Sequence, residues 1–120
     1  MLKIICTFVK MNITFSEKTL KKVVNDDRKL VQKFGKRRAD LIKRRLDDIA
    51  AAETLEELRH VPGRYHELKS NRKGEWACDL DHPYRLIFVP HEDPIPTDED
   101  GKYIWIEIRG VDVTEITDYH

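Results

Sequence analysis

The sequence predicts an α+β fold in which a helical hairpin packs on one face of a twisted, mainly antiparallel sheet of four to five strands. Two observations lead to this expectation. From residue 16 to about residue 59 the apolar residues recur at helical spacing, and from residue 65 onward they alternate with a period of two. With 120 residues, the chain is expected to form a single domain over residues 1–120.

The first helix is predicted by a stripe of apolar residues between Leu20 and Phe34, which Asp27 interrupts. Ser16 is expected to cap its N-terminus, because a serine hydroxyl can accept a hydrogen bond from a free amide of the first turn. Gly35 is expected to end this helix, since glycine readily adopts the backbone conformation that terminates a helix.

A second helix is predicted from about Lys36 to Ala52, where apolar residues again recur three and four positions apart. The tight link at Gly35 makes the two helices a hairpin. Thr54 and Glu57 have the spacing of a capping box, which predicts a short third helix that runs to Arg59.

The second half predicts four strands, and a further candidate lies near the N-terminus. The segment 84–89 is apolar on both faces except for Arg85, as in a central strand. A long polar loop is expected from Pro90 to Lys102. The apolar positions change parity after Gly110, which predicts a β-bulge there. The expected strands are residues 65–69, 75–80, 84–89 and 104–108, preceded by residues 4–9 or 13–15.

The charges are segregated, although the 22 basic and 22 acidic residues cancel. Between Ser16 and Leu46 twelve basic residues stand against four acidic ones, a net charge of +8, whereas residues 92–100 are acidic with no basic neighbour. Such asymmetry is compatible with a face that binds a polyanion. Charge alone favours the ordinary alternative, a solvated helical surface.

Several protein classes do not fit this sequence. No apolar run is long enough to span a membrane, and the first nine residues do not form a signal peptide, so a cytoplasmic protein without a membrane partner is expected. Cys6 and Cys78 fit a reducing compartment as buried thiols. No metal or cofactor is expected, because Asp98–Gly101 lacks the remaining ligands of a calcium loop. No zinc spacing is present among Cys6, Cys78, His82 and His91.

Several residues have the chemistry that metal-independent RNA cleavage needs. The reaction requires a base for the 2′-hydroxyl proton, an acid for the departing 5′-oxygen, and cations around the pentavalent phosphate. His66, Tyr119 and His120 can move protons, and these last two residues follow Asp118 at the end of a predicted strand. The residues that can hold phosphate are Lys69, Arg72, Lys73 and Arg85.

Each of these residues also has an ordinary structural interpretation. Strict alternation places His66 on the same face as Leu68, where a hydrogen-bonded core histidine is equally expected, and places Lys69 on the opposite face. Both can serve one site only if the strand ends or bends between them. Arg72-Lys73-Gly74 is typical of an exposed turn, whereas Arg85 in a central strand requires a phosphate or carboxylate partner.

Four spaced blocks carry a family resemblance: Val61–Lys69, Asn71–Trp76, Pro83–Phe88 and Thr117–His120. In these blocks the chain resembles the HigB-like killer proteins of the RelE/ParE superfamily of bacterial type II toxins. The resemblance implies a RelE-like fold, a role in plasmid maintenance, and ribosome-dependent cleavage of messenger RNA that inhibits translation. It also implies a helix-turn-helix HigA-like antitoxin, through which alone the toxin would meet operator DNA.

The resemblance also implies roles for individual residues. It implies that His66, Lys69, Asp118, Tyr119 and His120 occupy the functional positions, with Arg85 as a phosphate ligand. Together with the chemistry of the side chains, this predicts catalytic roles for His66, Lys69, Tyr119 and His120, and phosphate or RNA binding by Arg72, Lys73, Arg85 and Asp118. The chain departs from the family pattern at Glu67, where proline is usual, and at Asn71, where an acidic residue is usual. It is also neutral, whereas family toxins are typically basic.

A second function stays open at this point. A superfamily member without nuclease activity would act like the ParE gyrase poisons, or would persist as an antitoxin-bound, DNA-binding regulatory subunit. ParE-type chains do not need the terminal Asp118-Tyr119-His120, so the presence of this triplet favours the nuclease.

Overall fold

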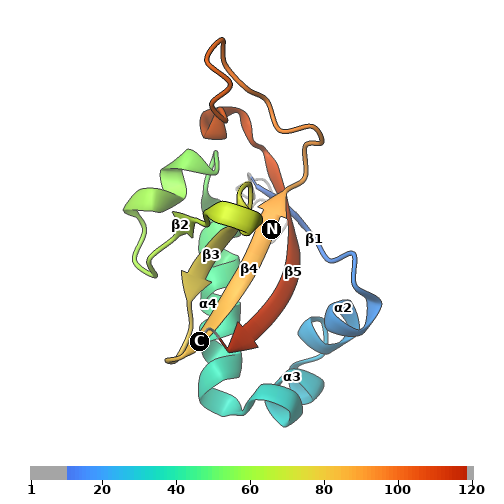
Figure 1. Ribbon diagram of the computed structural model, residues 1–120. Helices are drawn as coiled ribbons and strands as arrows, with labels where there is room; N and C mark the ends of the chain where they lie inside the picture. The colour runs from blue at the N-terminus through green and yellow to red at the C-terminus, as the bar shows by residue number, and fades with distance from the viewer. Residues whose placement is uncertain (1–10, 119–120) are drawn as a thin grey trace, which may run out of the picture.

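The computed structural model describes residues 11–118 and has an α+β architecture (Figure 1). Five strands form one sheet in the order β1-β5-β4-β3-β2, in which β1 is parallel to β5 and the other neighbours are antiparallel. The predicted mainly antiparallel sheet is therefore confirmed. The strands are β1 (Asn12–Thr14), β2 (His66–Glu67), β3 (Trp76–Asp79), β4 (Tyr84–Pro90) and β5 (Gly110–Asp118).

Three α-helices and three 3-10 turns accompany the sheet within residues 11–118. The helices are α2 (Lys18–Val24), α3 (Asp27–Phe34) and α4 (Lys36–Ala51), and the 3-10 turns are η1 (Glu56–His60), η2 (Ser70–Arg72) and η3 (Trp105–Glu107). In Figure 1, α4 lies behind the sheet, whereas η2 lies in front of it. No helix within residues 11–118 is long and apolar enough to cross a membrane.

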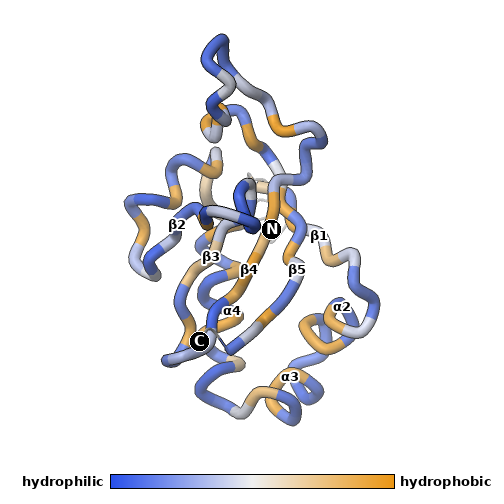
Figure 2. The backbone as a smooth tube through the Cα atoms, viewed as in Figure 1, coloured by the Kyte–Doolittle hydropathy of each residue, from blue (hydrophilic) through white to orange (hydrophobic). Residues whose placement is uncertain are grey.

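The centre of the sheet is β4, which is buried on both faces as the sequence predicted. Leu86 and Phe88 belong to the main core under the helices, whereas Ile87 belongs to a small separate cluster on the other face. Figure 2 shows the apolar residues running along β4, in contrast to the largely hydrophilic loop that follows it. Cys78 of β3 is a buried free thiol in the main core, and burial raises its pKa to about 12. Cys6 lies outside the described residues.

The helical half differs from the prediction at its start. Glu17, not Ser16, caps α2, because its carboxylate accepts hydrogen bonds from the amides of Thr19 and Leu20. Ser16 instead donates its hydroxyl to Asp112 of β5, at 3.0 Å. The prediction is wrong because both side chains can accept hydrogen bonds from free helix amides, and the bond from Ser16 to Asp112 leaves the cap position to Glu17.

The apolar stripe from Leu20 to Phe34 is also divided between two helices rather than one. The carboxylate of Asp26 accepts hydrogen bonds from the amides of Arg28 and Lys29, which starts α3 as a new helix. Gly35 ends α3 with φ +86°, as predicted. The predicted second helix corresponds to α4, and the capping-box segment leads into the 3-10 turn η1.

Two predictions about the last strand are wrong. Residues 104–108 contain the 3-10 turn η3 instead of a strand, with Ile106 61% exposed and Trp105 buried against Trp76 at a ring distance of 5.5 Å. Pairing between β4 and β5 begins at Pro90 and Val111, so residues 104–108 have no strand beside them. The β-bulge lies at Thr114, where the register shifts opposite Ile87 and Phe88, and not at Gly110. The N-terminal candidate at 4–9 lies outside the described residues, and the candidate at 13–15 corresponds to β1.

Helix α4 is fastened to the corner between β3 and β4 by two arginines. Arg38 donates to both carboxylate oxygens of Asp81, at 2.8 and 3.0 Å, and its guanidinium stacks 3.5 Å from the ring centroid of Tyr84. Arg45 donates from Nε to the backbone oxygen of Asp79 at 2.7 Å. This corner therefore depends on helix side chains that are distant in the sequence.

The Asp81 carboxylate should make stability depend on pH. Hydrogen bonds from Arg38 hold the pKa of Asp81 below its ordinary value of 3.8. A depressed folded-state pKa stabilises the fold above the unfolded-state pKa, and this contribution is lost as the pH falls through the folded-state pKa. Asp81→Asn should lower the free energy of unfolding by about 1–3 kcal/mol at pH 7. The difference from wild type should shrink below about pH 4 in urea titrations, and an unchanged difference at pH 3 would contradict this role.

Candidate active site

The face of the sheet opposite α4 brings together residues from four strands. The register places His66 of β2 beside Ala77 of β3, Ala77 beside Ile87 of β4, and Ile87 beside Glu115 of β5. These four residues form one row across the sheet. Since neighbouring strands are about 4.8 Å apart, His66 and Glu115 are about 15 Å apart along the row. We call this side of the sheet the open face.

His66 and Lys69 line the same pocket on the open face, of about 460 Å³. The strand ends at Glu67, and Ser70 takes a left-handed backbone conformation with φ +58° before η2 begins. His66 and Lys69 could serve one site only if the strand ended or bent between them, and it does so here. Leu68, which also lines this pocket, packs against Ala77 and Ile87.

The hydrogen bond of the His66 ring fixes which nitrogen can act as a base. Nδ1 of His66 lies 2.6 Å from the backbone oxygen of Arg64. Because a carbonyl oxygen only accepts hydrogen bonds, Nδ1 must carry the hydrogen in the neutral ring, and Nε2 is then the basic nitrogen. Arg64 itself has a left-handed φ of +54°, a conformation that nothing in its sequence predicts.

Arg85 has the carboxylate partner that its place in a central strand requires. Its Nε lies 3.3 Å from Oδ1 of Asp79, and its side chain is 19% exposed. Asp79 also accepts a hydrogen bond from Arg64 at 3.3 Å, so two guanidinium groups share one carboxylate. Arg64, Asp79 and Arg85 all line a pocket of about 140 Å³. The excess of positive charge there suits an anion.

The end of β5 lies at the same side of the sheet as Arg85. Arg85 pairs in register with Thr117, and Asp118 pairs with Tyr84 and is exposed. Tyr119 and His120, two of the predicted catalytic residues, lie outside the described residues. The strand register places the last described residue beside the Arg85 pocket.

Arg72 occupies a different environment from the exposed turn that the sequence suggested. Its guanidinium donates to Glu75 at 2.8 Å and also to Glu115 of β5. Hydrogen bonds from Arg72 to Glu115 and Glu75 raise its pKa further above the ordinary arginine value. Arg72 is thus already neutralised by two carboxylates on the open face.

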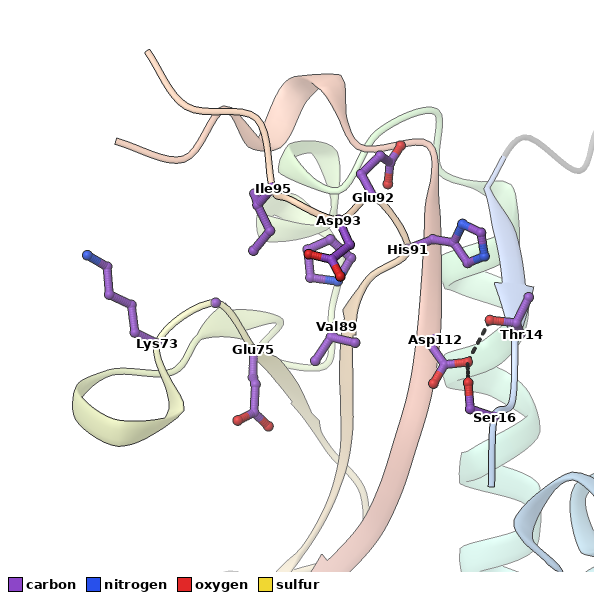
Figure 3. A pocket seen from close by; sticks show the side chains of 12 residues that line it. Thr14, Ser16, Lys73, Glu75, Val89, His91, Glu92, Asp93, Ile95 and Asp112 are labelled. Atoms are coloured by element: carbon purple, nitrogen blue, oxygen red, sulfur yellow. Dashed lines mark hydrogen bonds between the residues drawn. The ribbon is translucent and has the colours of Figure 1, made fainter. Parts of the chain in front are cut away.

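Lys73 lies away from His66, beside a larger pocket of about 620 Å³ at the far end of β4. Its ammonium lies 5.4 Å from the ring centroid of Tyr103. Figure 3 shows Asp112 in this pocket, where it accepts hydrogen bonds from the hydroxyls of Thr14 and Ser16. The carboxylates lining the pocket are Glu75, Glu92, Asp93 and Asp112, which is unfavourable for phosphate.

Some members of this constellation could not be found by sequence reasoning. Asp79 contacts Arg85 from the neighbouring strand, and Glu115 of β5 contacts Arg72 of η2 across the sheet. The contact of the Arg64 backbone oxygen with His66 is local, but no motif in the sequence indicates it. Among residues 11–118, no group of three or more histidine, cysteine, aspartate or glutamate side chains is arranged to hold a metal ion. Asp98, in the acidic Asp98–Gly101 segment, accepts hydrogen bonds from the amides of Asp100 and Lys102.

This sheet, with its helical layer and open face, is the RelE-like toxin fold. Residues 13–97 match the model of the HigB-like toxin family, described as the RelE-like toxin of the type II toxin-antitoxin system HigB. The chain belongs to this family and is a toxin of a type II toxin-antitoxin system. No curated protein matches its sequence.

Solved structures of YoeB from Staphylococcus aureus have a similar fold. A YoeB-YefM complex aligns with a TM-score of 0.54 and 21% sequence identity, over 92% of this chain and 98% of that chain. A YoeB dimer aligns with a TM-score of 0.53 and 22% identity over the same shares of the two chains. At these identities the likeness concerns the fold.

Proposed function

We propose that this protein is a ribosome-dependent, metal-independent endoribonuclease that cleaves messenger RNA in the cytoplasm and thereby inhibits translation. The observation that carries the proposal is the pocket shared by His66 and Lys69, in which the hydrogen bond from Nδ1 to Arg64 leaves Nε2 as a base. Arg85 lies on the same face, two strands away. A base and two cations on one face match the needs of phosphodiester transfer.

The proposed reaction needs no group beyond those of the chain and the RNA. His66 Nε2 removes the proton of the 2′-hydroxyl, and the resulting oxygen attacks the adjacent phosphorus. The bond between phosphorus and the 5′-oxygen breaks, which leaves a 2′,3′-cyclic phosphate and a 5′-hydroxyl end. His120, with Tyr119 and Asp118 beside it, is proposed to protonate the departing oxygen. Lys69 and Arg85 neutralise the charge that builds up on the phosphate oxygens.

The ribosome is proposed to hold the RNA in the geometry that this site lacks. The open face offers separate pockets rather than a deep groove, so the chain alone orders a flexible RNA poorly. A ribosome that presents an ordered messenger would remove this entropic cost. The exposed Arg37 and Arg44 on α4, together with the other basic residues of the helices, support a contact with ribosomal RNA.

Replacing either the proposed base or the proposed acid should greatly slow cleavage without unfolding the protein. His66→Gln and His120→Gln should each lower the single-turnover cleavage rate on translating ribosomes by about a hundredfold or more. Thermal melting of both variants should remain close to that of wild type. Primer extension on a messenger translated in a cell-free system measures the cut. Equal cutting of naked RNA, or full activity of His66→Gln, would overturn the proposal.

The basic helices should contribute to ribosome binding through exposed residues only. Arg38 and Arg45 hold the fold together, so the informative variant is Arg37→Glu with Arg44→Glu. It should lower co-sedimentation with ribosomes, and binding of wild type should weaken as salt rises. The control, Glu99→Gln with Asp100→Asn, changes charge in the exposed acidic loop. Equal effects of the two double variants would show that the helices are only solvated surface.

An antitoxin partner is proposed from family membership and from the apolar surface that the fold leaves uncovered. Ile106 is 61% exposed, and the partly buried Val23, Phe34 and Ile116 line a groove of about 190 Å³ between α2, α3 and β5. A YoeB relative of the same fold was solved with YefM. A HigA-like helix-turn-helix protein is the proposed partner here, and it would provide the only contact with operator DNA.

Coexpression tests this partner directly. Expression of the toxin alone should arrest growth, and coexpression with the adjacent open reading frame should relieve the arrest and yield a stable complex in size-exclusion chromatography. A monomer with no toxicity and no complex would instead favour a regulatory member of the superfamily without nuclease activity.

A further inference from the structure

We propose that Arg72 is a positioning residue and not an RNA ligand: with Glu75 and Glu115 it forms an ion triad that holds η2 across the sheet and fixes the wall of the His66 pocket. This inference rests on the proposed function of that pocket. It assigns to Glu75 and Glu115 a role that no sequence pattern indicates, and it reassigns Arg72 from the phosphate binding that the sequence suggested.

The contacts of Arg72 satisfy its charge within the protein. Nε and Nη2 donate to the same oxygen of Glu75, at 3.2 and 2.8 Å, and Nη2 also donates to Glu115. One guanidinium between two carboxylates leaves the triad with a net charge of −1. An RNA phosphate that approached Arg72 would therefore meet net repulsion and would have to displace a bound carboxylate.

The triad spans most of the sheet. Arg72 belongs to η2, which follows β2 at one edge, whereas Glu115 belongs to β5 on the far side of β3 and β4. Between the two ends lies the small apolar cluster of Leu68, Ala77 and Ile87. The ion pair therefore crosses this cluster and holds η2 over it, which keeps three apolar side chains buried on the face opposite α4.

The pocket depends on this restraint because one loop builds it. Its lining residues are consecutive, from His66 to Arg72. The loop is closed by the bonds from the Leu68 amide to the Glu75 oxygen at 2.8 Å and from the Arg72 amide to the Lys69 oxygen at 3.1 Å. Ser70 within it has φ +58°, which is unfavourable for a residue with a side chain. Glu75 supports the loop twice, through its backbone and through Arg72.

Positioning and phosphate binding predict opposite effects of removing Glu115. If Arg72 bound phosphate, Glu115→Gln would free a cation, tighten RNA binding and preserve or raise cleavage. If Arg72 positions the loop, Glu115→Gln loosens η2 and slows cleavage, although the variant carries one negative charge less. If Arg72 bound phosphate, removal of the Glu115 carboxylate would not be expected to lower the cleavage rate.

The chain contains a matched control. Arg59 also binds two carboxylates, Glu56 three residues away and Glu67 across a chain turn, and it stacks on Trp76 at 4.8 Å. Glu56 and Glu115 are both 41% exposed at the side chain. Glu56→Gln thus removes the same charge and the same kind of contact outside the His66 pocket.

The test compares Glu115→Gln, Arg72→Gln and their double variant with Glu56→Gln in single-turnover cleavage on translating ribosomes. We expect each of the first two to lower the saturated rate by roughly tenfold to a hundredfold, as displaced catalytic groups do, with an unchanged ribosome concentration at half saturation. The double variant should be no slower than Arg72→Gln alone, because that substitution already breaks the contact with Glu115. Glu56→Gln should cleave like wild type. Tighter RNA binding or an unchanged rate for Glu115→Gln would overturn the proposal.

Amide hydrogen exchange separates this inference from the proposed function. Glu115→Gln and Glu115→Asp, both checked for folding by circular dichroism, should speed exchange of the Leu68, Arg72 and Glu75 amides, with the smaller effect for aspartate. Glu56→Gln should leave these amides protected. If wild type does not cut RNA, the nuclease proposal fails while the exchange experiment still tests the triad. Unchanged exchange in Glu115→Gln would overturn the triad even if the nuclease proposal holds.

Discussion

The burial of β4 on both faces is the constraint on which the rest of this structure depends. Leu86 and Phe88 require a thick apolar layer on one side, and the helices provide it. Ile87 requires cover on the other side, where η2 and the side chains of neighbouring strands provide it within residues 11–118. The helices therefore cover one face of the sheet, whereas the open face is buried only around Ile87 at its centre. The polar margins of that second face are where the candidate catalytic residues lie.

Arginine side chains connect distant parts of the chain around this strand. Arg38 and Arg45 connect α4 to the corner between β3 and β4, and Arg72 connects η2 to β5. The planar guanidinium suits such links because it can make several hydrogen bonds in fixed directions at once. The basic residues of the chain therefore divide into two groups. One group is used inside the fold, and the other, which includes Arg37 and Arg44, is exposed.

The open face is electrostatically uneven along β4. At the start of the strand, Arg64 and Arg85 share the single carboxylate of Asp79, whereas at its end the pocket of Asp112 and its neighbours is rich in carboxylates. A polyanion lying on this face would be attracted to the first end and repelled from the second. Under the proposed function, this gradient would favour RNA at the Arg85 end of β4, a preference that net charge alone does not reveal in a neutral chain.

The sequence by itself determined the layer architecture, the central strand and the candidate site residues. Hydrophobic period is a local property, so the change from helical to alternating spacing, the double burial of residues 84–89 and the break at Gly35 were all visible without the structure. The family resemblance also rested on short consecutive blocks, and the family match confirms it. Tyr119 and His120, which lie outside the described residues, remain predictions.

Only the tertiary structure decided which of several locally equivalent choices the chain makes. Ser16 and Glu17 are both good helix caps, and the partner Asp112 removed Ser16 from that role. Residues 104–108 alternate like a strand, yet β4 and β5 begin to pair only at Pro90 and Val111. Arg72 looks like a free cation in the sequence, and a carboxylate 43 positions away neutralises it. In each case the deciding partner is distant along the chain, and local spacing carries no information about which distant residues a fold brings into contact.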